Sequence, residues 1–135
     1  MIDYEELPRN SGKTKYILDS YIKDRENGIR SAIVVNPNDQ RRVASLVTVR
    51  SVDVFHYKQF KSILLTGEMR NYKKVYMDEF NCQGVLDLSH VVILDKADID
   101  VIIRTSSYGL SFHKWLGFTP EVVEYFTEKY PEMLI

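Results

Sequence analysis

The apolar positions of the chain fall into two alternating patterns, one with helical spacing and one with the compact or alternating spacing of strands. Helical spacing occurs over residues 13–27, 57–66 and 119–130. Short β-branched or alternating runs predict strands at residues 30–35, 51–56, 73–79 and 100–105. The run 86–94 fits either element, and Asn-Pro-Asn-Asp, beginning at Asn36, is typical of a helix start. This alternation indicates an α/β protein of three layers, a parallel β-sheet with helices on both faces.

The first seven residues form the weakest predicted strand. Only Ile2, Tyr4 and Leu7 are apolar there, and acidic residues fill the positions between them. A central strand of a parallel sheet is normally a continuous apolar run. The strand is therefore either short and polar, or it lies at an edge of the sheet.

Composition places the chain among ordinary globular proteins. A length of 135 residues predicts a single domain, residues 1–135, and 44% hydrophobic with 27% charged residues is typical of a soluble one. The net charge of −1 gives no overall attraction to nucleic acid or to an anionic membrane. A single cysteine, Cys82, cannot form an internal disulfide, and neither a signal peptide nor a long apolar run is evident. These features predict a cytoplasmic protein without a membrane partner.

The stretch from Leu7 to Thr14 matches a phosphate-binding loop, G-x-x-x-x-G-K-[ST], except that Leu7 replaces the first glycine. In such a loop, backbone N–H groups and the N-terminus of the following helix surround a polyphosphate. Gly12 would allow close backbone approach, Lys13 would reach the β- and γ-phosphates, and Thr14 would place its hydroxyl on Mg²⁺. The alternative is a chance tripeptide in a polar loop.

Two further polar segments follow predicted strands, and in an α/β fold ligands gather beyond the carboxyl ends of the strands. Asp78 and Glu79 end the strand at 73–79, and Thr105-Ser106-Ser107 ends the strand that begins at Asp100. Asp78 is of the right type to hold Mg²⁺ through its waters, Glu79 to deprotonate an attacking water, and Thr105 to sense the γ-phosphate. The alternative for this acidic pair is an ordinary solvated strand end, since strands often end in acidic residues. The combination with the upstream loop favours a magnesium–nucleotide site.

Together, these motifs resemble the additional-strand P-loop NTPases, and among them the helicase-like and phage terminase large-subunit ATPases. The resemblance covers residues 1–107 through the loop segment Pro8–Thr14, the segment 34–40 that ends in a glutamine, and the strand ending in Asp78-Glu79. It implies that Arg9, Asn10 and Ser11 help to bind the nucleotide, and that Arg9 acts as a phosphate-sensing or finger residue. The alternative for Arg9 is a solvated loop arginine.

The same resemblance implies ATP and Mg²⁺ as cofactors and a phage context linked to DNA translocation or packaging, in the host cytoplasm if the protein is viral. DNA, a second copy of the chain, and a phage or host protein are the partners that it implies. The sequence departs from the family in Leu7 and in its polar first strand. At 135 residues it has no room for the nuclease domain of terminases, and a P-loop domain of reduced size is expected.

Other candidate residues have simpler alternatives. Four arginines either form a basic patch for a nucleic-acid backbone or are ordinary solvated residues: Arg30, Arg41, Arg42 and Arg50. The histidines His56, His90 and His113 lack the spacing of a zinc site. The cluster Phe112, His113, Lys114 and Trp115 either stacks a base or anchors the last helix. Tyr125, Phe126 and Tyr130 are expected in the core or on a partner-binding face.

Two functional hypotheses follow. The first is an Mg²⁺-dependent ATPase in which Lys13 and Thr14 bind phosphate and metal, Asp78 completes the metal site, and Glu79 activates water. The second is a non-catalytic module that holds nucleotide weakly or not at all and acts through a protein partner, which Leu7 and the polar first strand favour.

Overall fold

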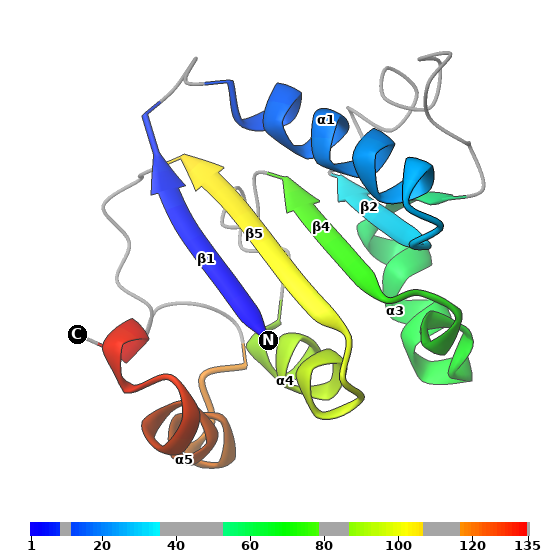
Figure 1. Ribbon diagram of the computed structural model, residues 1–135. Coiled ribbons are helices and arrows are strands. Elements are labelled where there is room, and N and C mark those ends of the chain that lie inside the picture. The colour runs from blue at the N-terminus through cyan, green and yellow to red at the C-terminus, as the bar shows by residue number, and fades with distance from the viewer. Residues whose placement is uncertain (9–11, 36–52, 79–86, 107–116, 135) are drawn as a thin grey trace.

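The computed structural model describes residues 1–8, 12–35, 53–78, 87–106 and 117–134. Its centre is a five-stranded sheet whose paired strands are all parallel. The strands are β1 (Ile2–Leu7), β2 (Ser31–Val35), β3 (Val54–His56), β4 (Lys74–Asp78) and β5 (Asp100–Ser106). Their spatial order is β1-β5-β4-β2-β3, so β5 lies between β1 and β4 (Figure 1). The predicted parallel α/β class is confirmed.

Helices lie on both faces of this sheet. They are α1 (Lys13–Glu26), α3 (Tyr57–Thr66), α4 (Leu88–Lys96) and α5 (Pro120–Lys129), with 3₁₀ turns η2 (Glu68–Asn71) and η5 (Pro131–Leu134). In α1, Ile17 and Tyr21 are buried against one face, in a cluster with Ile33 of β2 and Tyr76 of β4. On the other face, α3, α4 and α5 share a larger core (Figure 1). Among the described residues, the predicted three-layer arrangement is thus present.

Local sequence signals explain where most helices begin and end. His56 begins α3 because its Nδ1 accepts hydrogen bonds from the N–H groups of Lys58 and Gln59, and Gly67 ends the helix in a left-handed conformation. Thr119 begins α5 by accepting from the N–H of Val122, as its sequence predicts. Where residues 86–94 allowed either element, the structure has helix α4. The strand predicted at 51–56 is shorter, since β3 begins only at Val54.

β1 is an edge strand, paired with β5 and with no other strand of the described sheet. Ile2 and Tyr4 pack into the core shared with α4 and α5, whereas Asp3 and Glu5 lie on the opposite face and remain about half exposed. The polar sequence of this strand therefore follows from its place at the edge, where one face of the strand stays accessible to water. Of the two alternatives left open by the sequence, the edge position is correct.

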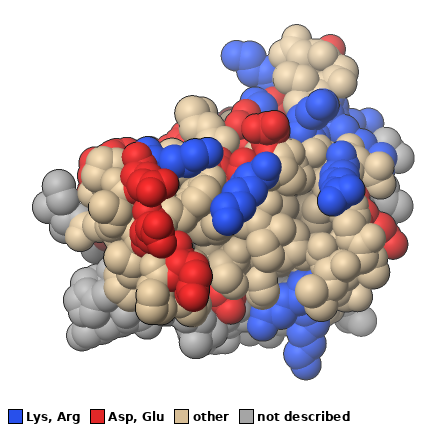
Figure 2. All heavy atoms as spheres, turned by 90° about the horizontal axis from the view of Figure 1, so that it is seen from below, with Lys and Arg blue, Asp and Glu red and all other residues tan. Residues whose placement is uncertain are grey.

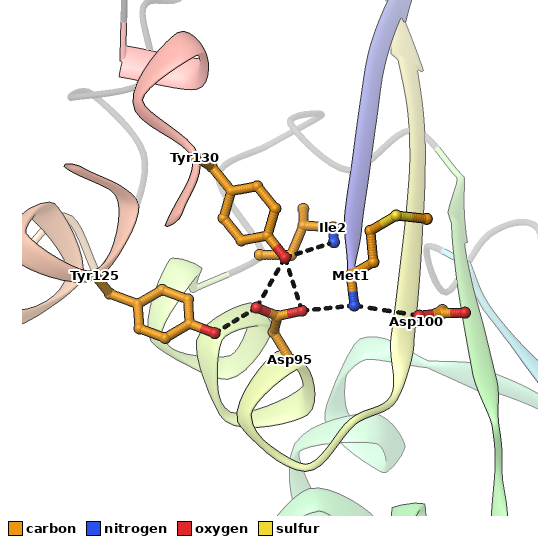
Figure 3. Close-up of polar contacts among 6 residues, drawn as sticks. All are labelled: Met1, Ile2, Asp95, Asp100, Tyr125 and Tyr130. Atoms are coloured by element: carbon orange, nitrogen blue, oxygen red, sulfur yellow. Dashed lines mark hydrogen bonds and ion pairs between the residues drawn. The ribbon is translucent and has the colours of Figure 1, made fainter. Parts of the chain in front are cut away.

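A buried carboxylate fixes the start of β1 (Figure 3). The side chain of Asp95 in α4 is only 3% exposed, and it forms an ion pair of 2.7 Å with the N-terminal ammonium of Met1. The hydroxyl groups of Tyr125 and Tyr130 also donate to Asp95, and the Tyr130 hydroxyl accepts from the N–H of Ile2 at 3.1 Å. Since β1 leads toward the predicted phosphate loop, this network anchors the strand at the end that is farther from that loop.

Within the described parts of the chain, no helix has the length and apolar character needed to cross a membrane.

Candidate functional site

The start of α1 lies beyond the carboxyl ends of the strands, as the predicted loop requires (Figure 1). Gly12 immediately precedes the helix with φ of 84°, in the left-handed region that favours glycine, and its carbonyl accepts from the N–H of Tyr16 at 2.9 Å. Among the residues that the structure describes, no side chain caps this end, and the first turn carries no acidic residue. The partial positive charge of the helix N-terminus is therefore not neutralised by a carboxylate of its own first turn.

Thr14 of α1 and Asp78 of β4 meet in space although they are 64 residues apart in the sequence. The Thr14 hydroxyl donates a hydrogen bond of 2.7 Å to Oδ2 of Asp78. Asp78 is the last residue of β4 and is only 7% exposed. The last residue of the loop motif and the last residue of β4 therefore meet at the carboxyl end of the sheet.

Lys13, the first residue of α1, is also buried, with 7% of its surface exposed. Lysine is almost never buried to this extent unless its ammonium has a partner, and Lys13 does engage in an interaction. Its burial beside Thr14 concentrates a cation, a hydroxyl and a carboxylate at the end of the sheet where α1 begins.

Arg104 of β5 adds a second buried cation on the α1 face, and the sequence analysis did not single it out. It is aligned with Asp78 across the β4–β5 pair, and its guanidinium donates to both carboxylate oxygens of Asp3 at 3.1 and 3.0 Å. The guanidinium also lies 4.9 Å from the ring centre of Tyr16 in α1. Burial opposes the charge, but the carboxylates of Asp3 and Glu5 raise the pKa of Arg104. Arg104 thus connects β1 and α1 to β5. The sequence signal that could have identified it is a single arginine within an otherwise β-branched strand.

The remaining predicted site residues are only partly covered by the structure. Arg9, Asn10, Ser11 and Glu79 lie outside the described residues. The backbone of Thr105 belongs to β5, where it is paired in register with Glu6 of β1. The roles of Thr105 and of the four residues outside the described ranges stay predictions.

The other candidates are placed as follows. Arg30 stacks on Tyr72, with its guanidinium carbon 4.7 Å from the ring centre, and His56 caps α3. His90 in α4 meets the ring of Phe60 edge-on, and burial lowers its pKa. Phe126 is in the core, as expected. The following candidates lie outside the described residues: Arg41, Arg42, Arg50, Cys82, Phe112, His113, Lys114 and Trp115.

The oxygens of Thr14 and Asp78 suit a magnesium–phosphate ligand. Because the Thr14 hydroxyl donates its only proton to Asp78, its oxygen lone pairs remain available as acceptors. Thr14 could therefore bind Mg²⁺ through a lone pair while its proton stays on Asp78, and Asp78 could hold the waters of the ion. No cluster of three or more His, Cys, Asp or Glu is found among the described residues. Mg²⁺ does not need one, because it commonly uses one or two protein ligands together with phosphates and water.

No protein-family model matches the chain, and no curated protein is significantly similar to it. The arguments about function therefore rest on the sheet and on the residues at its carboxyl edge.

Proposed function

We propose that this chain is a P-loop nucleotide-binding domain that holds Mg-ATP at the carboxyl edge of its sheet and hydrolyses it. The observation that carries the proposal is the hydrogen bond between Thr14 and Asp78. These two residues were expected at one site because one ends the loop motif and the other ends an apolar strand. A chance tripeptide in a polar loop would have no reason to meet that carboxylate.

Each residue has a separate task in this proposal. The left-handed Gly12 and the first turn of α1 offer backbone N–H groups to the phosphates, and Lys13 adds a positive charge. Thr14 and Asp78 hold the metal ion, whose chemistry when bound is to neutralise the phosphate oxygens. Glu79, next along the chain from Asp78, is the proposed base for the attacking water.

The strand order supports the same class. β5 is inserted between β1, which leads to the loop, and β4, which ends at Asp78. An inserted strand at this position is the feature after which the additional-strand P-loop class is named. The wider context of a phage protein linked to DNA translocation or packaging, with DNA or further protein copies as partners, is part of the proposal. An ATPase rate that rises on addition of duplex DNA would support it.

Nucleotide titration with matched variants tests the proposal. A ligand at 100 times its Kd stabilises the folded protein by about 2.7 kcal/mol, which a thermal-shift assay detects easily. We expect such a shift with Mg-ATP for the wild type and none for Lys13→Ala. Lys15→Ala, which removes an exposed lysine two positions further along α1, should keep the full shift. Glu79→Gln should keep binding and abolish turnover, and hydrolysis that survives this change would exclude Glu79 as the base.

A second candidate function is a non-catalytic module that binds a partner protein. Leu7 favours it, because the last residue of β1 has a leucine side chain where the loop motif has its first glycine. In this case ATP, GTP and ADP would all fail to stabilise the wild type. Binding without turnover would indicate an intermediate form, a nucleotide-dependent module rather than an ATPase.

A further inference from the structure

A pocket lies on the α1 face of the sheet, between α1 and the strands β1, β5 and β4. Its volume is about 360 Å³. Tyr76 of β4 and Ile102 of β5, which are paired in register, line it on the side of the sheet. One stripe of α1 lines the other side, with residues three or four positions apart: Tyr16, Ser20, Lys23 and Asn27. We call this feature the α1 pocket.

Tyr16 is the residue in this stripe that lies nearest to the proposed phosphate site, because it follows Thr14 by two positions. The guanidinium carbon of Arg104 lies 4.9 Å from the centre of its ring, and 45% of Tyr16 is exposed. Single exposed aromatic residues are common on protein surfaces. This one, however, is supported by a buried arginine and lines a pocket, so its ring is available to stack on a second planar group.

Helix geometry places Thr14 and Tyr16 on opposite flanks of α1. Each residue of an α-helix is rotated by about 100° from the last, so two positions correspond to about 200° and to about 3 Å along the axis. Thr14 accordingly contacts Asp78 of β4, whereas Tyr16 contacts Arg104 of β5. A triphosphate that has its terminal phosphate near Thr14 and that crosses the first turn of α1 would therefore direct its other end toward Tyr16.

The charges that line the α1 pocket suit an uncharged polar group. Each of its three carboxylates forms an ion pair: Asp24 with Lys74, Asp100 with the N-terminal ammonium of Met1, and Asp3 with Arg104. Lys23 is exposed to solvent, where its charge is screened. Figure 2 views the molecule from the end at which the strands begin; acidic side chains gather on the left, and basic ones are spread over the rest. This mixed charge favours a neutral nucleoside in the pocket over a further phosphate group.

We infer that Tyr16 is the stacking platform for the base of the bound nucleotide, and that the part of the α1 pocket between Tyr16 and Ser20 receives the nucleoside. Ser20 lies about 9 Å beyond Thr14 along the helix axis, within reach of a nucleoside whose phosphates are bound at the start of α1. Tyr76 and Ile102 provide the aromatic and apolar surface that such a pocket needs. The inference rests on the proposed function, because it concerns the other half of the same ligand.

Calorimetric titration with two ligands tests the inference: Mg-ATP and magnesium tripolyphosphate, which has three phosphates and no nucleoside. We expect the wild type to bind Mg-ATP at least about tenfold more tightly than tripolyphosphate. Tyr16→Leu should weaken Mg-ATP at least about tenfold and leave tripolyphosphate unchanged, whereas Tyr16→Phe keeps the ring and should bind both ligands as the wild type does. Leu65→Ala, which shortens an α3 side chain that is 85% exposed, is the control and should change neither affinity.

The outcomes separate this inference from the proposed function. A wild type that binds neither ligand would exclude the nucleotide site, and the role of Tyr16 with it. A wild type that binds both ligands equally, or a Tyr16→Leu variant with full affinity for Mg-ATP, would overturn the platform alone. Equal weakening of both ligands by Tyr16→Leu would give Tyr16 a structural role at the start of α1, which also overturns the inference. The wild-type comparison needs no variant, so it decides the matter even if Tyr16→Leu fails to fold.

Discussion

Three glycines allow backbone strain to be separated from ligand contact at the proposed phosphate loop. Gly12, Gly28 and Gly67 have φ values of 84°, 72° and 80°, and a Cβ built on any of them would meet no other atom within 4 Å. Alanine at each position therefore brings the same cost, that of a left-handed conformation. We expect each single Gly→Ala variant to lose roughly 1 kcal/mol of unfolding free energy.

The effect on nucleotide binding should differ among the three variants. The proposal places the polyphosphate against the backbone at Gly12, so the added methyl group competes with the phosphates for that space. Gly28 follows the C-terminus of α1 and Gly67 follows α3, both at the amino end of the sheet. At 100 times the wild-type Kd, Mg-ATP should still add about 2.7 kcal/mol to the Gly28→Ala and Gly67→Ala variants, and almost nothing to Gly12→Ala.

Urea unfolding monitored by circular dichroism, with and without Mg-ATP, measures both quantities for each variant. A Gly12→Ala protein that keeps the full increment would refute close phosphate approach at this residue. Apo stabilities that differ among the three variants by much more than about 1 kcal/mol would refute the claim that their strain is equivalent.

Three further predictions concern stability. Gly117→Ala should cost about 2–3 kcal/mol in urea unfolding, because its Cβ would lie 1.7 Å from Oδ1 of Asp87 and displace the N-cap of α4. In an Asp87→Ala background the cost should fall to that of the positive φ and the remaining close contact, 3.0 Å, with the backbone nitrogen of Leu88. Burial alone would raise the pKa of Asp95, but hydrogen bonds from the N-terminal ammonium and two tyrosines hold it below 3.8. Its stabilisation should therefore be complete above pH 3.8 and be lost as the pH falls through the lower folded-state pKa, and Asp95→Asn should remove this dependence in urea titrations at acid pH. Arg104→Lys should lose the two-pronged contact with Asp3 and destabilise the protein by roughly 1–2 kcal/mol, measured as a lower urea midpoint.

Elements with local signals were predictable from the sequence. The apolar stripe of α1 predicted which side of the helix is buried, and Thr119 with Pro120 predicted where α5 begins. α4 was ambiguous because Val91, Val92, Ile93 and Leu94 are consecutive apolar residues, which have no period that distinguishes a helix from a buried strand.

Long-range features could be predicted only where a motif connected them. The loop motif and the acid at the end of an apolar strand predicted that Thr14 and Asp78 would meet, although no local rule joins them. Arg104 was missed because its partners are on other elements: Asp3 on β1 and Tyr16 on α1. The polar character of β1 could not be interpreted before the strand order was known, since an edge position cannot be derived from the pattern of one strand.

The partners of the buried aspartates distinguish the candidate site from the structural framework. Four aspartates are buried among the described residues, and three of them, Asp24, Asp53 and Asp95, receive hydrogen bonds from tyrosine hydroxyls that join neighbouring elements. A tyrosine fills the space around its carboxylate with an aromatic ring, so such a pair is suited to packing. Asp78 instead receives the small hydroxyl of Thr14, at the edge of the sheet where a parallel α/β fold binds ligands. Removing a tyrosine hydroxyl should therefore lower stability alone, whereas Thr14→Val should also abolish the stabilisation by Mg-ATP.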